Sequence, residues 1–518
     1  MLISTFQPYP DVRFEGYGFF GLDYVAQEEG AASYQATTGN EVPPGEDGCY
    51  VVANPTEDGW IVGTDYWGMA RLFTYEASGN WAVASSLRIL VNHLKANGIT
   101  LEPDIPTLKG LAIRHSLTNQ IASRHTVIRG IELVPSYMAL RLDAQGIHQY
   151  KIERPLLDRY EDALSEYIGL WTGRLKTILH DEDSLLAADL SGGVDSRVVF
   201  SFLLSAGATD LGDERFRLVS NTKNADDFAP ASHIAQTYEL ELNGPPLQRR
   251  TPLNSERALE SWRNTSLGLY LPVYFVEQEF DPWSFQAHGA GGGNFRSPYE
   301  PGRGPIENLG RFNKYFDPKT FAIWRDRAEA DLERFATDTP SIPPHIMHFR
   351  QFRSRMHFGH RSHRRPMFTP LNAAALDDVY SLAGGRPNRQ VYFDVMGSLA
   401  PGLMSLPYDS EKKSPGRDIH EAATRISPRP EKRSGSIFAP LPEIGRDSNS
   451  PSAMTMWMEE SQSVLEQKDV REIMGEEALA EALAGIKMYR TQSKALRAND
   501  PAMRAISFAH TLRFAIGD

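Results

Sequence analysis

The residues in this sequence that are best suited to chemistry form the run Ser191-Gly192-Gly193-Val194-Asp195-Ser196. Two adjacent glycines allow the backbone to approach a ligand closely, and successive backbone N–H groups attract an anion. The hydroxyl groups of Ser191 and Ser196 can add hydrogen-bond donors. The spacing therefore predicts a site for a phosphate group, and the alternative is a glycine- and serine-rich turn that binds nothing.

A strand and a helix must hold this run in place. Residues 185–190 form a short apolar stretch that predicts a buried strand, and residues 197–204 have a helix-like pattern that closes at Gly207. The run would then lie at a helix N-terminus, where the helix dipole favours negative charge. The Gly-x-x-x-x-Gly-Lys-[Ser/Thr] loop of the common nucleotide hydrolases occurs nowhere in the chain.

Ser-Gly-Gly-x-Asp-Ser after a strand resembles the pyrophosphate loop of the ATP pyrophosphatase superfamily. With Arg197 next to it, the run is most similar to the asparagine-synthetase-like family. Members of this superfamily split ATP between the α and β phosphates and adenylate a substrate. The resemblance implies that ATP and Mg²⁺ are bound, with Asp195 as a ligand of the metal. The residues that it implies for nucleotide binding are Leu190, Ser191, Gly192, Gly193, Asp195, Ser196 and Gly289.

The composition is that of a globular protein with two or more domains, since 41% of the 518 residues are hydrophobic and 23% are charged. The net charge of −12 argues against a broad contact with nucleic acid. A single cysteine, Cys49, excludes an internal disulfide and a multi-cysteine zinc site. No stretch approaches the roughly 20 apolar residues of a membrane span, and the first residues lack the pattern of a signal peptide. We therefore expect a cytoplasmic protein.

Residues 1–155 are rich in short strand-like segments with turns between them and contain few predicted helices. Parts of this region, at residues 63–73, 82–86 and 129–137, resemble a diverged glutamine amidotransferase domain. The resemblance implies an Ntn-type domain of packed sheets with helices on the outer faces. The predicted strands cover residues 48–53, 60–64, 69–75, 81–85 and 138–142.

The catalytic cysteine of such a domain is absent. In the amidotransferases an N-terminal cysteine hydrolyses glutamine with its own amine as the base, but position 2 here is Leu2. Cys49 lies inside a predicted strand and fits a small buried core residue better than a nucleophile. The resemblance therefore predicts a scaffold domain without glutaminase activity, similar in layout to β-lactam synthetases and lasso-peptide cyclases.

Residues 156–518 are predicted to form an α/β synthetase domain with a parallel sheet and a helical C-terminal part. A helix is predicted over residues 156–180, a second strand over 216–220, and a helix from a cap at Asp226 and Asp227 to Tyr238. Strand, helix and strand in this order predict a parallel sheet, in which a ligand lies at the carboxyl ends of the strands.

Two later motifs have lost acidic residues. The glycine-rich stretch 286–296 occupies the place of the family's second nucleotide loop, where Gly289 matches but the acidic positions fall on Ala290, Gly293 and Asn294. Residues 368–372 resemble the family's Pro-Phe-Leu-Asp element with Asn372 in place of the acid. Because Mg²⁺ normally takes carboxylate ligands, these losses leave open whether the chain turns over its substrate.

The late loop at residues 406–417 contains the candidate catalytic lysines, Lys412 and Lys413. Family members place a lysine there to stabilise the charge that develops as pyrophosphate leaves. The alternative is a charged surface turn.

Three further segments have predictable structure. Residues 388–394 are predicted to begin a helix, and residues 464–483 are predicted to be helical. Residues 421–450 are predicted to form a mobile segment or a lid.

Five histidines and six arginines lie within residues 345–365. On a helix, His357, His360, Arg361 and Arg364 would share one face, which could bind a phosphate or a carboxylate. The alternative is a solvated face whose arginines pair with carboxylates. A zinc site is not expected, because no cysteine or well-placed acid completes it.

The resemblance therefore implies an ATP-dependent, AMP-forming ligase that joins a carboxylate to an amine or ammonia. The carboxylate could belong to a small molecule, a peptide or a sugar, and relatives of the Ser-Gly-Gly-x-Asp-Ser-Arg type suggest a cell-surface polysaccharide or peptide natural-product pathway. One alternative is a nucleotide-binding pseudoenzyme of the same family. A third alternative is sulfur transfer to tRNA, as in another branch of the superfamily. It is disfavoured, because it would need reactive cysteines and a basic surface. The sequence does not specify the oligomeric state.

The first prediction concerns glutamine. Because Leu2 replaces the nucleophile, the purified protein should release no glutamate from glutamine in a coupled glutamate assay. The Cys49→Ala variant serves as the comparison. Glutamate release that disappears in this variant would show that Cys49 has taken over the nucleophilic role.

Overall fold

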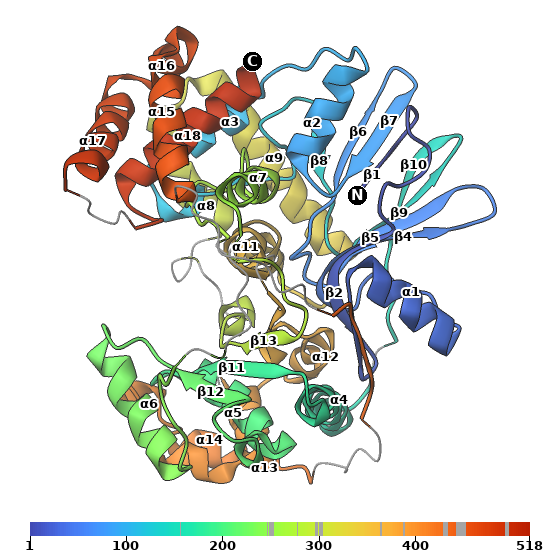
Figure 1. Cartoon of the computed structure of the whole chain (residues 1–518), viewed down its shortest axis with the longest axis vertical. Coiled ribbons are helices and arrows are strands. Elements are labelled where there is room, and N and C mark those ends of the chain that lie inside the picture. Colours follow the sequence, from blue (N-terminus) through green and yellow to red (C-terminus); the bar gives the residue numbers. More distant parts are fainter. Residues whose placement is uncertain are drawn as a thin grey trace.

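The computed structural model is a mixed α/β protein with antiparallel sheets at one end and a parallel sheet at the other (Figure 1). For residues 360–362 and 492 the structure describes the backbone but not the side chains. The residues that the structure describes are 1–155, 157–245, 247, 253–276, 278–295, 299, 304–362, 365–386, 389–427, 434–441, 452–492 and 497–517.

Two sheets are built mainly from the first 151 residues. In the described residues, one sheet has the strand order β10-β9-β5-β4-β2-β3-β15 and the other has the order β1-β7-β6-β8. The pairings are antiparallel except that of β3 with β15. The strands are β1 Leu2–Ser4, β2 Phe14–Phe20, β3 Asp23–Ala26, β4 Asp47–Pro55, β5 Trp60–Thr64, β6 Phe73–Ala77, β7 Asn80–Ala84, β8 Ile131–Leu133, β9 Met138–Asp143, β10 Gly146–Lys151 and β15 Ile437–Phe438.

Four of the five predicted strands are confirmed as β4, β5, β7 and β9. The strand predicted over residues 69–75 is wrong in its first half, because β6 begins only at Phe73. The Asp65 carboxylate accepts hydrogen bonds from the backbone N–H groups of Met69 and Ala70, both at 2.9 Å, and these bonds hold a turn there. Burial raises the pKa of Asp65 to about 7.

Helices are more frequent in this region than the sequence suggested. They are α1 Gln27–Thr38, α2 Leu87–Ala96 and α3 Ile105–Leu111. Side chains cap two of them, since Ser86 accepts from the N–H of Ile89 and Asp104 accepts from the N–H of Thr107. Helix α1 was missed because its sequence has no apolar stripe, and Tyr34 is its one large buried side chain among the described residues.

The predicted parallel sheet is confirmed. Its strands are β11 Leu185–Asp189, β12 Phe216–Val219, β13 Ser284–Ala287 and β14 Met367–Phe368. All pairings are parallel and the order is β12-β11-β13-β14. The strand order therefore reverses between β11 and β13, which is where such sheets bind ligands beyond the carboxyl ends of the strands. A glycine-rich loop follows each of these two strands.

Helices pack around the parallel sheet (Figure 1). They include α4 Tyr160–His180, α5 Val194–Ala206, α6 Ala225–Thr237, α12 Ala374–Leu382, α13 Gln390–Leu399 and α14 Arg417–Glu421. Helix α5 ends at Gly207, whose φ of +89° is a left-handed conformation that favours glycine. The predicted caps of α6 are wrong, because Asn224 is the N-cap residue and Asp226 and Asp227 lie in the first turn.

Most of the remaining helices lie at the end of the molecule away from the parallel sheet, beside the β1-β7-β6-β8 sheet (Figure 1). The predicted helix over residues 464–483 is confirmed as parts of three helices separated at Gln467 and Gly475. No helix in the described part of the chain is long and apolar enough to cross a membrane. The helices of this group are α7 Ser255–Thr265, α8 Pro305–Gly310, α9 Pro318–Asp338, α10 Pro344–His348, α11 Arg355–Ser362, α15 Ala453–Glu466, α16 Lys468–Met474, α17 Glu476–Gln492 and α18 Pro501–Ile516.

The segment predicted as mobile or as a lid contains a strand. β15 pairs in parallel with β3, with Ile437 opposite Tyr24 and Phe438 opposite Val25. The prediction is therefore wrong for these residues, because apolar side chains and backbone hydrogen bonds hold them on the N-terminal sheet. Residues 428–433 and 442–450 of this segment lie outside the described residues.

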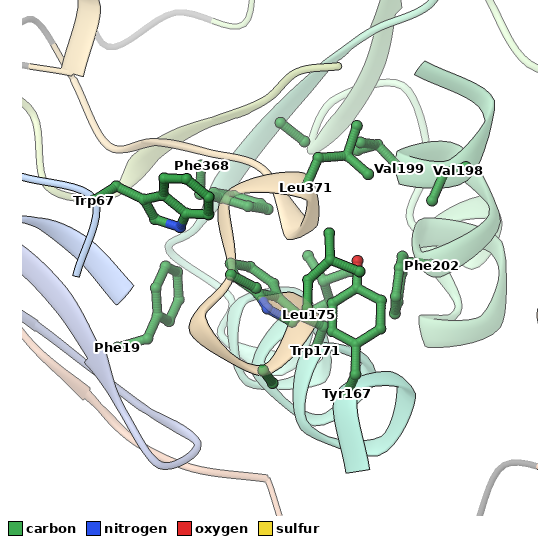
Figure 2. Close-up of a cluster of buried hydrophobic side chains, with 14 of the residues drawn as sticks. Phe19, Trp67, Tyr167, Trp171, Leu175, Val198, Val199, Phe202, Phe368 and Leu371 are labelled. Atoms are coloured by element: carbon green, nitrogen blue, oxygen red, sulfur yellow. The ribbon is translucent and has the colours of Figure 1, made fainter. Parts of the chain in front are cut away.

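One continuous hydrophobic core joins the antiparallel and parallel halves (Figure 2). Phe368 at the end of β14 lies between them, with its ring centroid 5.8 Å from that of Phe19 and 5.9 Å from that of Trp171. Trp171 belongs to α4 and is 1% exposed. Burial of such aromatic side chains contributes the largest apolar areas, so the two halves stabilise each other.

A buried ion pair also crosses this interface. Asp47 of β4 pairs with Arg174 of α4, and their side chains are 3% and 1% exposed. The second Asp47 oxygen accepts the backbone N–H of Ala374 at 2.7 Å, and Arg174 Nε donates to the carbonyl of Gly21 at 2.8 Å. Each buried charge therefore has several partners, which offset the cost of removing it from water.

The Asp47→Ala variant should lose about 3–5 kcal/mol of unfolding free energy, because it leaves the Arg174 guanidinium buried without its carboxylate. Chemical denaturation would measure the loss. The matched control is Asp58→Ala, which removes a pair with Arg141 in which the aspartate side chain is 69% exposed, and it should leave the midpoint unchanged. Equal midpoints for both variants would contradict a role for the buried pair.

Candidate functional site

A cavity of about 570 Å³ lies at the carboxyl ends of β11 and β12 and at the loop after β13. Its volume is in the usual range for small-molecule sites. The cavity contains all of the predicted nucleotide-binding residues except Gly192. Its lining residues are Asp189, Leu190, Ser191, Gly193, Val194, Asp195, Ser196, Val219, Ser220, Asn221, Asp227, Gly289, Arg389 and Lys413.

The loop after β11 is held in shape by its own serines. Ser196 Oγ accepts the backbone N–H of Ser191 at 3.1 Å and lies 3.0 Å from Ser191 Oγ. Ser191 Oγ in turn accepts the N–H of Gly193 at 3.2 Å. The hydroxyl groups that were predicted as ligand donors therefore also fix the loop, and a phosphate would have to share them.

Helix α5 begins inside the cavity. Gly193 is its N-cap residue and has no side chain to accept a hydrogen bond from the first turn. The first N–H groups of a helix have no intrahelical partners, and the helix dipole adds positive potential there. This arrangement favours binding of an anion at the N-terminus of α5.

Two glycines allow the surrounding segments to touch this loop. A Cβ atom at Gly289 would lie 2.8 Å from the backbone nitrogen of Ser196, so the loop after β13 packs against the start of α5. A Cβ atom at Gly192 would lie 2.6 Å from Cβ of Asp409. Gly192 was predicted to bind the nucleotide, but the structure places it against the late loop, where its small size permits close packing.

The Asp195 carboxylate faces the second glycine-rich loop. A Cβ atom at Gly292 would lie 2.3 Å from Asp195 Oδ2, so a larger residue there would force this carboxylate to move. Asp195 also lines the cavity. The two loops predicted from the sequence therefore meet at one carboxylate, as expected for loops that follow neighbouring strands.

Two positions where the resemblance led us to expect acids are occupied by amides that bind each other. Asn294 Nδ2 donates to Asn372 Oδ1 at 2.7 Å. Gly291, at φ +108°, allows this contact, because a Cβ atom there would lie 2.2 Å from the same oxygen. Two carboxylates this close would repel each other unless a cation lay between them, whereas the amide pair is stable without one.

The carboxylates of the cavity would suit a divalent metal ion that is bound together with phosphate groups. Asp189, Asp195 and Asp227 all line the cavity. In the described residues, no group of three or more histidine, cysteine, aspartate or glutamate side chains is arranged to hold a metal alone. Mg²⁺ usually needs one or two carboxylates in addition to phosphate oxygens and water, and Asp195 with Asp189 could supply them.

Arg197 binds the late loop to α5. It is 0% exposed and donates from Nη1 to the carbonyls of Leu403 at 3.1 Å and Leu406 at 2.9 Å, and from Nη2 to the carbonyl of Pro407. Its guanidinium lies 3.7 Å from the ring centre of Tyr408. Burial lowers the pKa of Arg197. The sequence marked Arg197 as part of the motif but did not predict this contact.

The structure separates the two candidate lysines. Lys413 lines the cavity and forms an ion pair with Asp409. Lys412 is not among the lining residues, and its carbonyl accepts a hydrogen bond from Arg389 Nη2 at 2.9 Å. Within the described residues, Lys413 is therefore the lysine placed to meet a phosphate.

Arg389 is a site residue that sequence reasoning missed. It lines the cavity and precedes α13 with a left-handed φ of +68°. Such a conformation is costly for a residue other than glycine and often occurs at functional sites. The sequence predicted a helix that begins within residues 388–394 and includes Arg389, whereas α13 begins at Gln390 and Arg389 is its N-cap residue. Nothing in the sequence pattern marked it as a site residue.

The His/Arg-rich segment is helical in α10, in residues Phe349–Ser354, which form a π-helix, and in α11, so the condition set for a shared face is met in the described residues. The buried Arg350 forms two hydrogen bonds of 2.9 Å with Asp377. His357 Nδ1 lies 2.6 Å from the Tyr270 hydroxyl. Arg350 therefore pairs with a carboxylate, as the alternative expected, but it is buried and does not lie on a solvated face. The side chains of His360, Arg361 and Arg364 lie outside the described residues.

Cys49 is a core residue, as predicted. It lies in β4, is 2% exposed, and belongs to the main hydrophobic core. Burial raises the pKa of its thiol well above the usual value, which disfavours the thiolate that nucleophilic chemistry needs. Leu2 is also buried, in β1.

No family model matches the chain, and no curated protein matches it either.

The Arg197→Lys variant should loosen the late loop, because lysine keeps the charge but cannot reach three carbonyls with a planar fork. We expect faster hydrogen exchange in residues 403–413 and a loss of about 1–3 kcal/mol of unfolding free energy. Arg417→Lys is the matched control, since the Arg417 side chain is 91% exposed. Unchanged exchange in residues 403–413 would show that the loop does not depend on Arg197.

Proposed function

We propose that this chain is an ATP-dependent, AMP-forming ligase that joins a substrate carboxylate to an amine or ammonia. The observation that carries the proposal is the meeting of three features in one cavity. These are the Ser-Gly-Gly-x-Asp-Ser loop at the start of α5, the glycine-rich loop after β13, and Lys413 from the late loop. This combination suits a nucleoside triphosphate better than a neutral ligand.

The proposed reaction has two steps. A carboxylate oxygen attacks the α-phosphorus of ATP, the bond to the bridging oxygen breaks, and pyrophosphate leaves with the β and γ phosphates. The amine nitrogen then attacks the acyl carbon, a proton is lost from nitrogen, and AMP leaves. Magnesium bound with ATP would neutralise phosphate charge. The chain supplies orientation through its backbone N–H groups and positive charge through Lys413 and Arg389.

The proposal also covers the layout of the chain. Residues 1–155 would be a diverged Ntn-type amidotransferase-like domain without glutaminase activity, and residues 156–518 would be an asparagine-synthetase-like domain. The buried Cys49 and Leu2 support the loss of glutamine use. A cytoplasmic location and a role in a biosynthetic pathway remain part of the proposal.

A second function, a nucleotide-binding pseudoenzyme, is favoured by the Asn294–Asn372 pair. Both amides stand where the family carries acids, and they bind each other. A chain with this pair could retain the first nucleotide loop and bind ATP without adenylating a carboxylate.

Substitution of Lys413, together with an exchange assay, distinguishes the ligase from the pseudoenzyme. In a magnesium-dependent ATP–pyrophosphate exchange assay across a panel of carboxylic acids, we expect exchange with at least one acid. Lys413→Ala should lower its rate by about 10²–10³-fold, because one preorganised charge partner in the transition state is lost. ATP affinity should change little.

Lys412→Ala is the matched control and should exchange at the normal rate, since Lys412 does not line the cavity. Binding of MgATP without exchange for any acid would favour the pseudoenzyme. Exchange at the normal rate in Lys413→Ala would show that the late loop is a charged surface turn.

A further inference from the structure

Asp409 holds the lysine that faces the cavity. Lys413 Nζ forms an ion pair with Asp409 Oδ2 across the short 3₁₀ turn Glu411–Lys413. The backbone supports this turn, because the N–H of Lys413 donates to the carbonyl of Ser410 at 3.0 Å. The Lys413 side chain is 43% exposed and the Asp409 side chain 13%, so the aspartate is the more buried partner and the lysine the more exposed one.

The pyrophosphate-type loop itself positions Asp409. The backbone N–H of Asp409 donates to the carbonyl of Gly192 at 3.1 Å. A Cβ atom at Gly192 would lie 2.6 Å from Cβ of Asp409. The preceding Tyr408 lies under the Arg197 guanidinium. The carboxylate is therefore built against the loop and does not depend on Lys413 for its place.

The second oxygen of this carboxylate, Oδ1, is buried and has no hydrogen-bond partner among the described residues. A buried carboxylate oxygen without a partner is costly. Asp409 therefore gains from its contact with Lys413, and it lies beside a loop that suits phosphate groups. Two negative groups, the carboxylate and a bound phosphate, would compete for one ammonium.

We propose that Asp409 is a positioning residue that competes with the nucleotide's phosphate groups for Lys413 and takes the lysine back after the reaction, when pyrophosphate dissociates from the site. This inference rests on the proposed nucleotide site. The competition keeps Lys413 from binding ground-state phosphate tightly, so that its charge acts mainly when negative charge develops in the transition state.

The test is a double-mutant cycle measured by calorimetry with MgATP and with inorganic pyrophosphate. Asp409→Asn keeps the size of the side chain and the backbone contact with Gly192 but removes the competing charge. It should bind both ligands about three- to fivefold more tightly, the scale of a partly exposed ion pair. In a Lys413→Ala background, the same substitution should have no effect.

Catalysis supplies a second readout. Asp409→Asn should lower the KM for ATP without raising kcat for exchange, because the lysine would already be bound in the ground state. A merely structural role would instead raise KM or lower stability. Glu411→Gln is the matched control, since Glu411 is an exposed acid on the same turn that does not line the cavity.

Each outcome is decisive. Unchanged or weaker binding in Asp409→Asn overturns the inference, and so does tighter binding that persists without Lys413, which would indicate direct repulsion of phosphate by Asp409. If the unsubstituted protein binds neither MgATP nor pyrophosphate, the proposed nucleotide site itself fails, and the inference fails with it.

Discussion

The buried guanidinium of Arg197 is the interaction on which the candidate site depends. It joins α5, the helix that begins at the glycine loop, to three carbonyls of residues 403–407. The late loop therefore moves with the start of α5, and Lys413 and Asp409 are brought to the same cavity. Arg389 is connected indirectly, through the carbonyl of Lys412. A charge buried without a carboxylate is costly, and here backbone carbonyls and the Tyr408 ring offset that cost.

The N-terminal half supports the second glycine loop through contacts around Arg350. Arg350 is paired with Asp377 and also donates from Nε to the carbonyl of Asn294 at 2.9 Å. Its guanidinium lies 4.5 Å from the ring centre of Trp67, which the N-terminal half contributes. The Tyr66 hydroxyl donates to the same Asp377. Removing this half would therefore disturb residues next to the cavity as well as the shared core.

Local patterns predicted the parts of the fold whose signals lie close together in the sequence. The strand, turn and helix from Leu185 to Gly207 could be predicted because one apolar strand, two glycines and one helical stripe occur in order. Arg389 and Asp409 could not, because their roles depend on contacts with residues far away in the chain. The same reason explains the lysines: Lys412 and Lys413 are equivalent in sequence, and only the tertiary packing of the late loop decides which of them faces the cavity.

Strand β15 has a consequence for how the chain can be divided. It comes from the second half of the sequence, yet it completes the edge of the N-terminal sheet beside β3, and α1 packs closely over it through Gly30. Residues 1–155 alone would leave the backbone of β3 as an open edge, which is a template for pairing with other chains. The N-terminal sheet is thus completed by residues that follow the predicted boundary near residue 155. If the gene were split or a domain exchanged at that point, the first fragment would lack β15. The second fragment would carry β15 without the sheet on which it pairs.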